Sequence, residues 1–325
     1  MYSYKTLQEL VNKEIALGGF VKEPKQLYEP IKYILSLGGK RIRPVFVLMA
    51  CNLFSNKIEN AINAALALEI FHNFTLLHDD IMDKSSLRRN KPTVHTKWNS
   101  NIAILSGDAM SIIAYEYITR VKSDNFLELI NVFNKTALQV CEGQQYDMNF
   151  ETEKLVSETN YLQMIKLKTA VLISASLKIG ALIGEASQED TELLYLFGIN
   201  IGIAFQIQDD FLDVYADTKV FGKKIGNDIL TNKKTYLLIK AFELAKEHDY
   251  EELYNKFFID NNPSEEKVHS VVNIYNKLGI KEIAQNKIAE YFNKAFSYLD
   301  KVSVSTERKK ELASFVKNSL INRDK

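Results

Sequence analysis

The sequence contains few residues that interrupt regular structure, and few cysteines. Its 325 residues include 13 glycines and 5 prolines, which is too few for the turn-rich patterning of an all-β protein. Its two cysteines, Cys51 and Cys141, lie in apolar helical patterns and match no metal-ligand spacing. We therefore expect a helical protein from a reducing compartment, with both cysteines present as buried free thiols.

An excess of charge of one sign and long apolar runs are also missing. The 41 lysines and arginines balance 41 aspartates and glutamates, so no overall field attracts nucleic acid or an acidic membrane surface. No uncharged apolar stretch reaches the roughly 18 residues that a membrane span needs, and Lys178 interrupts the stretch 170–184. The first residues show no signal-peptide pattern. We expect a cytoplasmic protein with no integral membrane segment and no nucleic-acid partner.

Apolar residues recur at helical spacing along most of the chain, and hydrophobic residues make up 46% of it. Alternation typical of strands is nearly absent, and no break is long enough to be an interdomain linker. We therefore predict one all-α domain over residues 1–325, a single large helical bundle. The expected helical segments are 58–82, 102–118, 126–148, 162–183, 193–214, 236–245, 268–299 and 311–321.

Two copies of the pattern D-D-x-x-D are the most informative feature. They are Asp79-Asp80-Ile81-Met82-Asp83 and Asp209-Asp210-Phe211-Leu212-Asp213. Each lies in an apolar helical run, where residues four apart share a face. Two such carboxylates about 4 Å apart repel by about 4 kcal/mol at an effective dielectric of about 20. Mg²⁺ relieves this repulsion, typically by binding one or two carboxylates together with substrate phosphates. We predict that the two helices face one another across a central cavity.

Two basic segments provide candidate phosphate ligands. Residues 39–44 place three cations after a glycine pair, at the start of an apolar helical run, where backbone amides also favour anions. Residues 84–92 follow the first acidic motif and contain Arg88 and Arg89, whose guanidinium groups suit phosphate oxygens. Either segment alone is typical of a solvated loop. Their association with the paired carboxylates favours a diphosphate site.

With these motifs in view, the chain resembles the trans-isoprenyl diphosphate synthases, the polyprenyl synthetase family that includes farnesyl and geranylgeranyl diphosphate synthases. The resemblance runs from about residue 38 to the C-terminus and follows ten motifs in order. They are 38–44, 72–83, Gly107-Asp108, Gly143-Gln144 with Asp147, Lys168-Thr169, 204–210, Gly222-Lys223, Gly226 with Asp228, Lys233 with Thr235, and 323–325.

The resemblance implies an isoprenoid synthase type I fold and a Mg²⁺-assisted, head-to-tail transfer of an allylic diphosphate to isopentenyl diphosphate. The implied metal ligands are Asp79, Asp83, Asp209 and Asp213, supported by Asp80, Asp210, Gln144 and Asp147. The implied ligands of the allylic diphosphate are Arg88, Lys168, Lys223 and Lys233. Those of isopentenyl diphosphate are Lys40, Arg43, His72 and Arg89. The catalytic residues are Lys168, Thr169 and Gln206, of which the last two steady the developing allylic cation.

Several positions leave alternatives open. Lys166 competes with Lys168, and Lys224 with Lys223, because a change of helix phase or a one-residue shift in a loop exchanges them. Asn90 and Asn232 stand where glycine is commoner in the family. Water would quench the cation, so the site must close, and residues 221–234 and 323–325 are candidate lids.

The helix before the first motif suggests the length of the product. Phe71, Thr75 and Asp79 share one face at steps of four, and Phe74 borders that face. Thr75 lies one turn, about 5.4 Å, below Asp79, with both phenylalanines deeper. Core packing is the usual role of a helical phenylalanine, but bulk at this depth resembles a floor for short products. We predict farnesyl or, in preference, geranylgeranyl diphosphate.

Two other functions compete with this interpretation. A class I terpene cyclase shares the helical fold, but it needs a single diphosphate site and has no use for residues 38–44. A non-catalytic partner subunit of a heteromeric prenyl synthase would not require intact motifs. By analogy with the family, we also expect a homodimer.

Overall fold

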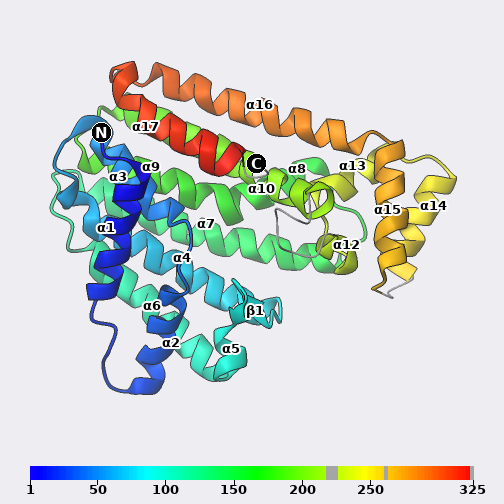
Figure 1. Cartoon of the computed structure of the whole chain (residues 1–325), viewed down its shortest axis with the longest axis horizontal. Helices are drawn as coiled ribbons and strands as arrows, with labels where there is room; N and C mark the ends of the chain where they lie inside the picture. The colour runs from blue at the N-terminus through cyan, green and yellow to red at the C-terminus, as the bar shows by residue number, and fades with distance from the viewer. Residues whose placement is uncertain (217–225, 260–262, 323–325) are drawn as a thin grey trace. The chain divides into compact units, whose positions relative to one another are not determined.

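The computed structural model describes residues 1–216, 226–259 and 263–322, which are helical over most of their length (Figure 1). The prediction of an all-α protein is confirmed. The described strands are two short ones, β1 (Leu87–Arg88) and β2 (Lys91–Pro92), which pair as an antiparallel hairpin that the sequence patterns did not indicate. The chain forms two compact units, so the single domain over residues 1–325 stays a prediction. The first unit comprises Met1–Asn134, Ala175–Leu194 and Ser303–Leu312, and the second comprises Lys135–Ser174, Tyr195–Val302 and Ala313–Lys325.

The first unit is built around one long helix, α4 (Ile62–Met82), which follows the short η1 (Ile58–Ala61). Its residues 64–71 are buried without a break, so this helix lies inside its unit on all sides. The surrounding elements are α1 (Tyr4–Leu17), α2 (Lys25–Ser36), α3 (Ile42–Phe54), α5 (Val94–Lys97) and α6 (Ser100–Ile118). All five contact α4, and α6 lies beside it along much of its length (Figure 1).

A glycine allows α6 to approach α4 closely. A Cβ atom on Gly107 would lie 2.3 Å from Nε2 of His78, so any larger residue would displace that imidazole. His78 also meets the carbonyl of Ile104 at 3.2 Å, and Nε2 lies 3.9 Å from Asp108. The close contact holds the end of α4 that carries the first aspartate motif.

Four helices contribute residues to both units: α7 (Phe126–Thr152), α9 (Val171–Ile183), α10 (Gln188–Tyr215) and α17 (Thr306–Val316). The remaining helices belong to the second unit. They are α8 (Glu158–Ile165), α12 (Asn227–Leu230), α13 (Tyr236–Leu244), α14 (His248–Tyr254), α15 (Glu265–Lys277) and α16 (Ile280–Lys301), with the π-helical segments η2 (Lys166–Ala170), η3 (Asn255–Ile259) and η4 (Lys317–Ile321).

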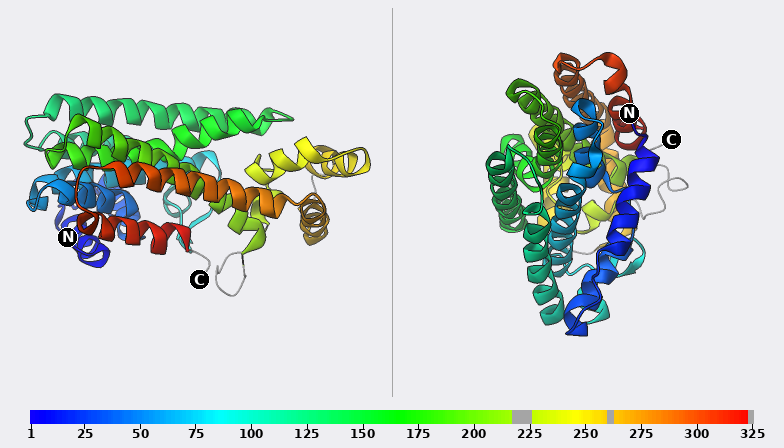
Figure 2. Two further views of the ribbon diagram at one scale, coloured as in Figure 1. Left: turned by 90° about the horizontal axis from the view of Figure 1, so that it is seen from above. Right: turned by 90° about the vertical axis from the view of Figure 1, so that its left-hand side faces the viewer.

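The prediction of one continuous helix over 268–299 was wrong, and the predicted helix over 162–183 contains a π-helical turn that the apolar spacing did not indicate. Residues 268–299 divide into α15 and α16 at Gly279, whose φ of 69° ends the first helix and begins the second (Figure 2). Residues 162–183 divide into α8, the π-helical segment η2 and α9. The apolar spacing continued through Gly279 and through η2 because the helices on either side bury similar side chains.

One cysteine was also wrongly predicted. Cys51 is buried, as expected, and burial raises the pKa of its thiol to about 12, but Cys141 on α7 is exposed. Helical periodicity marks an apolar face only statistically, and Cys141 lies outside the buried stripe of α7. No helix in the described part of the chain combines the length and apolar character that a membrane crossing requires.

Candidate active site

The first aspartate motif ends α4, and its middle residue is the most deeply buried. Asp80 is 2% exposed, Asp79 is half-buried, and Asp83, the C-cap, is exposed. The C-terminal end of a helix carries partial negative charge, so carboxylates there require a cation. Arg88 provides it: Nε donates to the Asp80 oxygens at 2.9 and 2.8 Å, and Nη2 donates to Oδ1 at 2.7 Å.

The same guanidinium reaches the neighbouring aspartate. Nη2 of Arg88 lies 3.6 Å from Oδ2 of Asp79. Burial raises the pKa of Asp80, and the hydrogen bonds and charge of Arg88 oppose that rise. Arg88 was predicted as a ligand of the allylic diphosphate; in the structure it contacts the first aspartate motif directly and holds Asp80 in place.

The hairpin that carries Arg88 also explains Asn90. The two residues between the strands, Arg89 and Asn90, have φ values of 53° and 60°, the left-handed pair of a type I′ hairpin turn. Asparagine tolerates this conformation nearly as well as glycine, so the substitution leaves the hairpin intact. The hydroxyl of Tyr33 on α2 donates to the carbonyl of Pro92 at 2.8 Å and ties the hairpin to the unit.

The glycine pair before α3 brings a second arginine of the hairpin close. Gly38 and Gly39 have φ values of 75° and 121°. A Cβ atom on Gly39 would lie 2.7 Å from the guanidinium carbon of Arg89, so the absence of a side chain at this position is what admits Arg89. The loop at 38–41 and the hairpin turn therefore meet.

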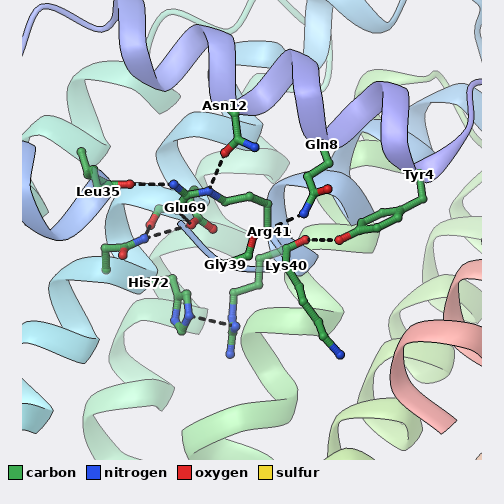
Figure 3. A network of polar contacts seen from close by, with 11 residues as sticks. Tyr4, Gln8, Asn12, Leu35, Gly39, Lys40, Arg41, Glu69 and His72 are labelled. Atoms are coloured by element: carbon green, nitrogen blue, oxygen red, sulfur yellow. Dashed lines mark hydrogen bonds and ion pairs between the residues drawn. The ribbon is translucent and has the colours of Figure 1, made fainter. Parts of the chain in front are cut away.

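Arg43 and His72 complete this cationic cluster. Nη1 of Arg43 lies 3.1 Å from Nε2 of His72 (Figure 3). Burial, followed by the charges of Arg43 and Arg89, lowers the pKa of His72 well below its usual value, and burial lowers the pKa of Arg43 to about 10. His72 is therefore neutral, and its Nε2 accepts the hydrogen bond from Arg43. With exposed Lys40, these residues form the set predicted to bind isopentenyl diphosphate.

The third cation of residues 39–44 has a different role, which the sequence did not reveal. Arg41 is 5% exposed, and its Nη1 lies 2.6 Å from Oε1 of Glu69, which is 2% exposed. Nη2 of Arg41 donates to the carbonyl of Leu35 at 2.6 Å, and Nε donates to Asn12 at 3.0 Å. This buried pair fixes the loop against α4. Glu69 lies in an apolar run, where no spacing singled it out.

The second aspartate motif lies in the last turns of α10, and again its middle residue is buried. Asp210 is 2% exposed and accepts hydrogen bonds from the Tyr161 hydroxyl at 2.5 Å and from the Tyr236 backbone N–H at 2.9 Å. Burial raises the pKa of Asp210 to about 7; repulsion from Asp228 adds to the rise, whereas Lys233 opposes it. Sequence reasoning identified neither tyrosine.

Asp213 connects this motif to the following segment. Its Oδ2 accepts from the backbone N–H of Asp228 at 2.9 Å, and its carbonyl accepts from Gly226 at 2.7 Å. Burial, and then repulsion from Asp228, raises the pKa of Asp213 to about 6. Asp209 is half-buried on the same helix. The raised pKa values of Asp210 and Asp213 mean that a bound cation would act strongly on these two carboxyls.

Lys168 and Thr169 lie in η2, where the backbone follows the wider π-helical path. Glycines on two neighbouring helices allow this segment to be enclosed: a Cβ on Gly143 would lie 2.2 Å from the Lys168 nitrogen, and one on Gly202 would lie 2.4 Å from Cα of Ala170. Single π-helical turns are often found at functional sites. Gly143 was noted in the sequence only as part of a motif.

The side chains of η2 contact other predicted site residues. Nζ of Lys168 lies 2.6 Å from Oδ2 of Asp147 on α7, which distinguishes it from Lys166. The Thr169 hydroxyl donates to Oε1 of Gln206 at 3.2 Å, and Nε2 of Gln206 lies 3.5 Å from Oδ1 of Asp210. This links η2 to the second aspartate motif. Gln144 lies three residues before Asp147 and is half-buried.

Lys233 is exposed in the turn before α13, and a buried lysine supports that turn. Asn232 has a φ of 57°, and its side-chain oxygen accepts from Nζ of Lys267, which is 1% exposed, at 2.5 Å. The asparagine thus adopts the left-handed conformation and also binds Lys267, which a glycine does not. Lys223, Lys224 and residues 323–325 lie outside the described residues, as do residues 221–225 of the first candidate lid.

The proposed chain-length residues lie on α4 as expected. Phe71 is 3% exposed, and its ring packs against those of Phe74 at 5.4 Å and Phe133 at 5.6 Å. Phe74 is half-buried and packs against His78 at 4.8 Å. The Thr75 hydroxyl donates to the carbonyl of His72 at 2.8 Å. Phe71 is therefore a core residue, whereas Phe74 and Thr75 retain some accessible surface.

The sequence is similar to a known protein family and to characterised members of it. The family model for polyprenyl synthetase matches residues 24–275. The chain is 38% identical over 282 residues to a geranylgeranyl diphosphate synthase of Methanosarcina mazei, covering 86% of this chain and 85% of that protein.

Solved structures show the same likeness in three dimensions. A crystal structure of a geranylgeranyl pyrophosphate synthase, 43% identical, superposes with a TM-score of 0.94 over 100% of both chains. A polyprenyl synthase of Caulobacter crescentus, solved with calcium and isoprenyl diphosphate, is 26% identical, with a TM-score of 0.85 over 97% of this chain and 95% of that one.

Proposed function

Because the chain belongs to the polyprenyl synthetase family of prenyltransferases, we propose that it condenses isopentenyl diphosphate head-to-tail with an allylic diphosphate. The allylic substrate is dimethylallyl, geranyl or farnesyl diphosphate, and the product is a short-chain prenyl diphosphate. The observation that carries this proposal is the first unit's arrangement. There, Arg88 of the hairpin binds Asp80 of the aspartate motif, while the adjacent Arg89 lies against Gly39 beside the separate cluster of cations.

Magnesium is the metal that these residues suit. Asp79, Asp83, Asp209 and Asp213 offer carboxylate oxygens, the ligands that Mg²⁺ prefers, and would hold it together with substrate phosphate. Bound Mg²⁺ would neutralise charge on the departing diphosphate. In the residues that the structure describes, no three metal-binding side chains are already clustered. We propose that the two motifs face one another across the cavity and bind the same diphosphate.

The cationic cluster of the first unit would hold isopentenyl diphosphate. Lys40, Arg43 and Arg89 supply positive charge for its diphosphate. Neutral His72 accepts from Arg43 through Nε2, so its Nδ1 carries the proton and is a donor. Two separate anchoring sites allow the alkene and the allylic carbon to meet in a fixed geometry, which contributes strongly to the rate.

The second unit would stabilise the developing allylic cation. The oxygen of Thr169 and the side chain of Gln206 are held together at 3.2 Å and present fixed dipoles. Arg88, Lys168 and Lys233, with Lys223, would bind the allylic diphosphate, with Gln144 and Asp147 in supporting positions. Asp80 and Asp210, each buried and fixed by hydrogen bonds, would hold the flanking metal ligands in place.

The assay that tests this proposal combines the purified chain with isopentenyl diphosphate and each of the three primers, with Mg²⁺ and with a chelator. We expect chain elongation that the chelator abolishes. A hydrocarbon formed from farnesyl diphosphate alone would instead identify a terpene cyclase. Inactivity of the pure chain with every primer would favour a non-catalytic subunit.

We propose geranylgeranyl diphosphate as the main product, with farnesyl diphosphate as the alternative. The support is the bulk of Phe71 and Phe74 on α4 below Asp79, together with the names of the similar synthases. Replacing Phe74 with alanine should lengthen the products, as read by chromatography. Phe71→Ala is the matched comparison. Unchanged product lengths in both variants would contradict the hypothesis that Phe71 and Phe74 limit the length of the product.

A homodimer is proposed as well, and α6 offers a surface for it. Its side chains Ile104, Leu105 and Ile112 are 44%, 60% and 63% exposed, an unusual concentration of apolar surface on one helix. Leu105→Glu should lower the mass measured by light scattering from that of a dimer to that of a monomer. A wild-type monomer at micromolar concentration would refute the dimer. The cytoplasmic location remains a prediction.

A further inference from the structure

The N-terminal helix α1 places a row of polar side chains on the loop at 38–41. Tyr4, Gln8 and Asn12 are spaced four residues apart and therefore share one face of α1. The hydroxyl of Tyr4 donates to the carbonyl of Lys40 at 2.8 Å, and Nε2 of Gln8 donates to the carbonyl of Gly39 at 3.2 Å. Oδ1 of Asn12 accepts from Nε of Arg41 at 3.0 Å. All three contacts are drawn in Figure 3.

A neighbouring stripe of buried residues anchors α1. Leu7, Val11 and Ile15 are buried, and α1 packs against α3 and α4. Ser3 caps its first turn by accepting from the backbone N–H of Thr6 at 3.2 Å. The row of polar side chains thus projects from a helix that is packed in place. It holds three consecutive residues of the loop, 39, 40 and 41.

The contacts orient the loop as well as holding it. In a trans peptide the carbonyl oxygen and the following N–H point in opposite directions. Drawing the carbonyls of Gly39 and Lys40 toward α1 therefore turns the amides of Lys40 and Arg41 away from it. Figure 3 shows the Lys40 side chain leaving the loop on the side away from α1, the side on which His72 lies. This is the side of the cationic cluster.

We infer that Tyr4 and Gln8 are positioning residues for isopentenyl diphosphate: they hold the glycine loop so that its amides and Lys40 face the cationic cluster. This rests on the proposed function, because that function assigns isopentenyl diphosphate to the cluster. Neither residue touches substrate. Both lie before residue 24, where the match to the family model begins, so the motifs of the family do not include them.

The test compares steady-state constants of Tyr4→Phe, Gln8→Met and the double variant with those of the wild type. Each change removes a donor and keeps the size of the side chain. Because two neutral hydrogen bonds are lost, we expect the double variant to raise KM for isopentenyl diphosphate about tenfold. The kcat and the KM for the allylic substrate should stay within about twofold. Glu9→Met, at an exposed neighbouring position on α1, is the matched control and should change none of these constants.

A second readout follows the loop itself. Amide hydrogen exchange of a peptide spanning residues 38–43 should be faster in the double variant than in wild type, with the thermal midpoint lowered by only a few degrees. An unchanged KM for isopentenyl diphosphate, or an equal rise in both KM values, would overturn the inference. If the wild type fails to condense isopentenyl diphosphate at all, the proposed function fails instead, so the two failures are distinguishable.

Discussion

The two aspartate motifs occupy corresponding places on their helices, but different groups balance their charge. Each lies at a helix C-terminus with its middle aspartate 2% exposed. Asp80 meets a guanidinium, that of Arg88, at 2.7 Å. Asp210 meets the neutral donors Tyr161 and Tyr236.

The difference shows in how strongly each carboxyl holds a proton. Burial raises the pKa of both middle aspartates, but the hydrogen bonds and charge of Arg88 offset that rise at Asp80, whereas Asp210 reaches about 7. The first motif thus carries its own counter-charge on the next hairpin. The second relies on hydrogen bonds, on the charge of Lys233 and, in our account, on the cations that arrive with substrate. Identical sequence patterns therefore create unequal electrostatic environments.

Removing one flanking carboxylate from either motif should have the largest effect. Asp79→Asn and Asp209→Asn keep the shape of the side chain and remove a charged ligand. We expect kcat/KM to fall by about 10²–10³ in each, comparable with the loss of one preorganised electrostatic contact. Steady-state assays at saturating Mg²⁺ measure this. Asp124→Asn, at an exposed position between α6 and α7, is the control. A loss confined to one motif would show that the two motifs do not contribute equally.

The middle aspartates should differ in their effect on folding stability. Asp80→Asn removes the nearest counter-charge of Arg88 and leaves Asp79, at 3.6 Å, as the remaining one. Its cost should be about 2–3 kcal/mol, below the about 3–5 kcal/mol of fully buried pairs, because the Arg88 side chain keeps 23% exposure. Asp210→Asn keeps an acceptor for Tyr161 and Tyr236, so it should cost about 1 kcal/mol. Urea unfolding without metal compares them. Equal losses would contradict the proposed difference in charge balance.

The cationic cluster near the first motif should make stability depend on pH. The folded pKa of His72 is well below the unfolded value of about 6.5, so below that pH the unfolded chain binds the additional proton. The contribution of His72 to stability is therefore present above about pH 6.5 and falls as the pH drops toward the folded pKa, by up to about 1.4 kcal/mol per unit. The raised pKa values of Asp210 and Asp213 contribute with the opposite sign, so the dependence is read as the difference between wild type and variant. His72→Gln should flatten this dependence in urea titrations between about pH 6.5 and 5. If the free energy of unfolding of His72→Gln depends on pH as strongly as that of the wild type, His72 is not the group responsible.

The smallest expected effect concerns the neutral donors of the second motif. Tyr161→Phe removes one hydrogen bond to Asp210 and leaves the ring in place. The free energy of unfolding should fall by about 1 kcal/mol. Tyr161 and Asp80 belong to different units, so the effect should be additive with that of Asp80→Asn in a double-mutant cycle. A coupling energy well above zero would contradict the proposal that the two motifs stabilise the fold independently.

Much of the fold was predictable because helices and their spacing are local properties. The long helix that carries Asp79 and the helical setting of Asp209 follow from apolar periodicity. The break at η2 did not, because a π-helical turn keeps apolar residues in sequence while changing which face they occupy. That turn depends on Gly143 and Gly202, which come from other helices and are distant in the sequence.

The candidate site was predictable in its charged residues and less so in their supports. Arg41 and Arg43 look alike in the sequence, yet one is bound in a buried pair to Glu69 and the other meets His72. Only tertiary packing distinguishes them. Tyr161 was missed for the same reason, since a tyrosine in a helical pattern gives no signal of the buried aspartate that it will meet.

The most direct test of the central claim is a crystal structure with an uncleavable allylic thiolodiphosphate and Mn²⁺ in place of Mg²⁺. The account predicts anomalous peaks at coordination distance from carboxylates of both motifs, all contacting one diphosphate. Peaks at one motif alone, with the other turned away from the ligand, would contradict it.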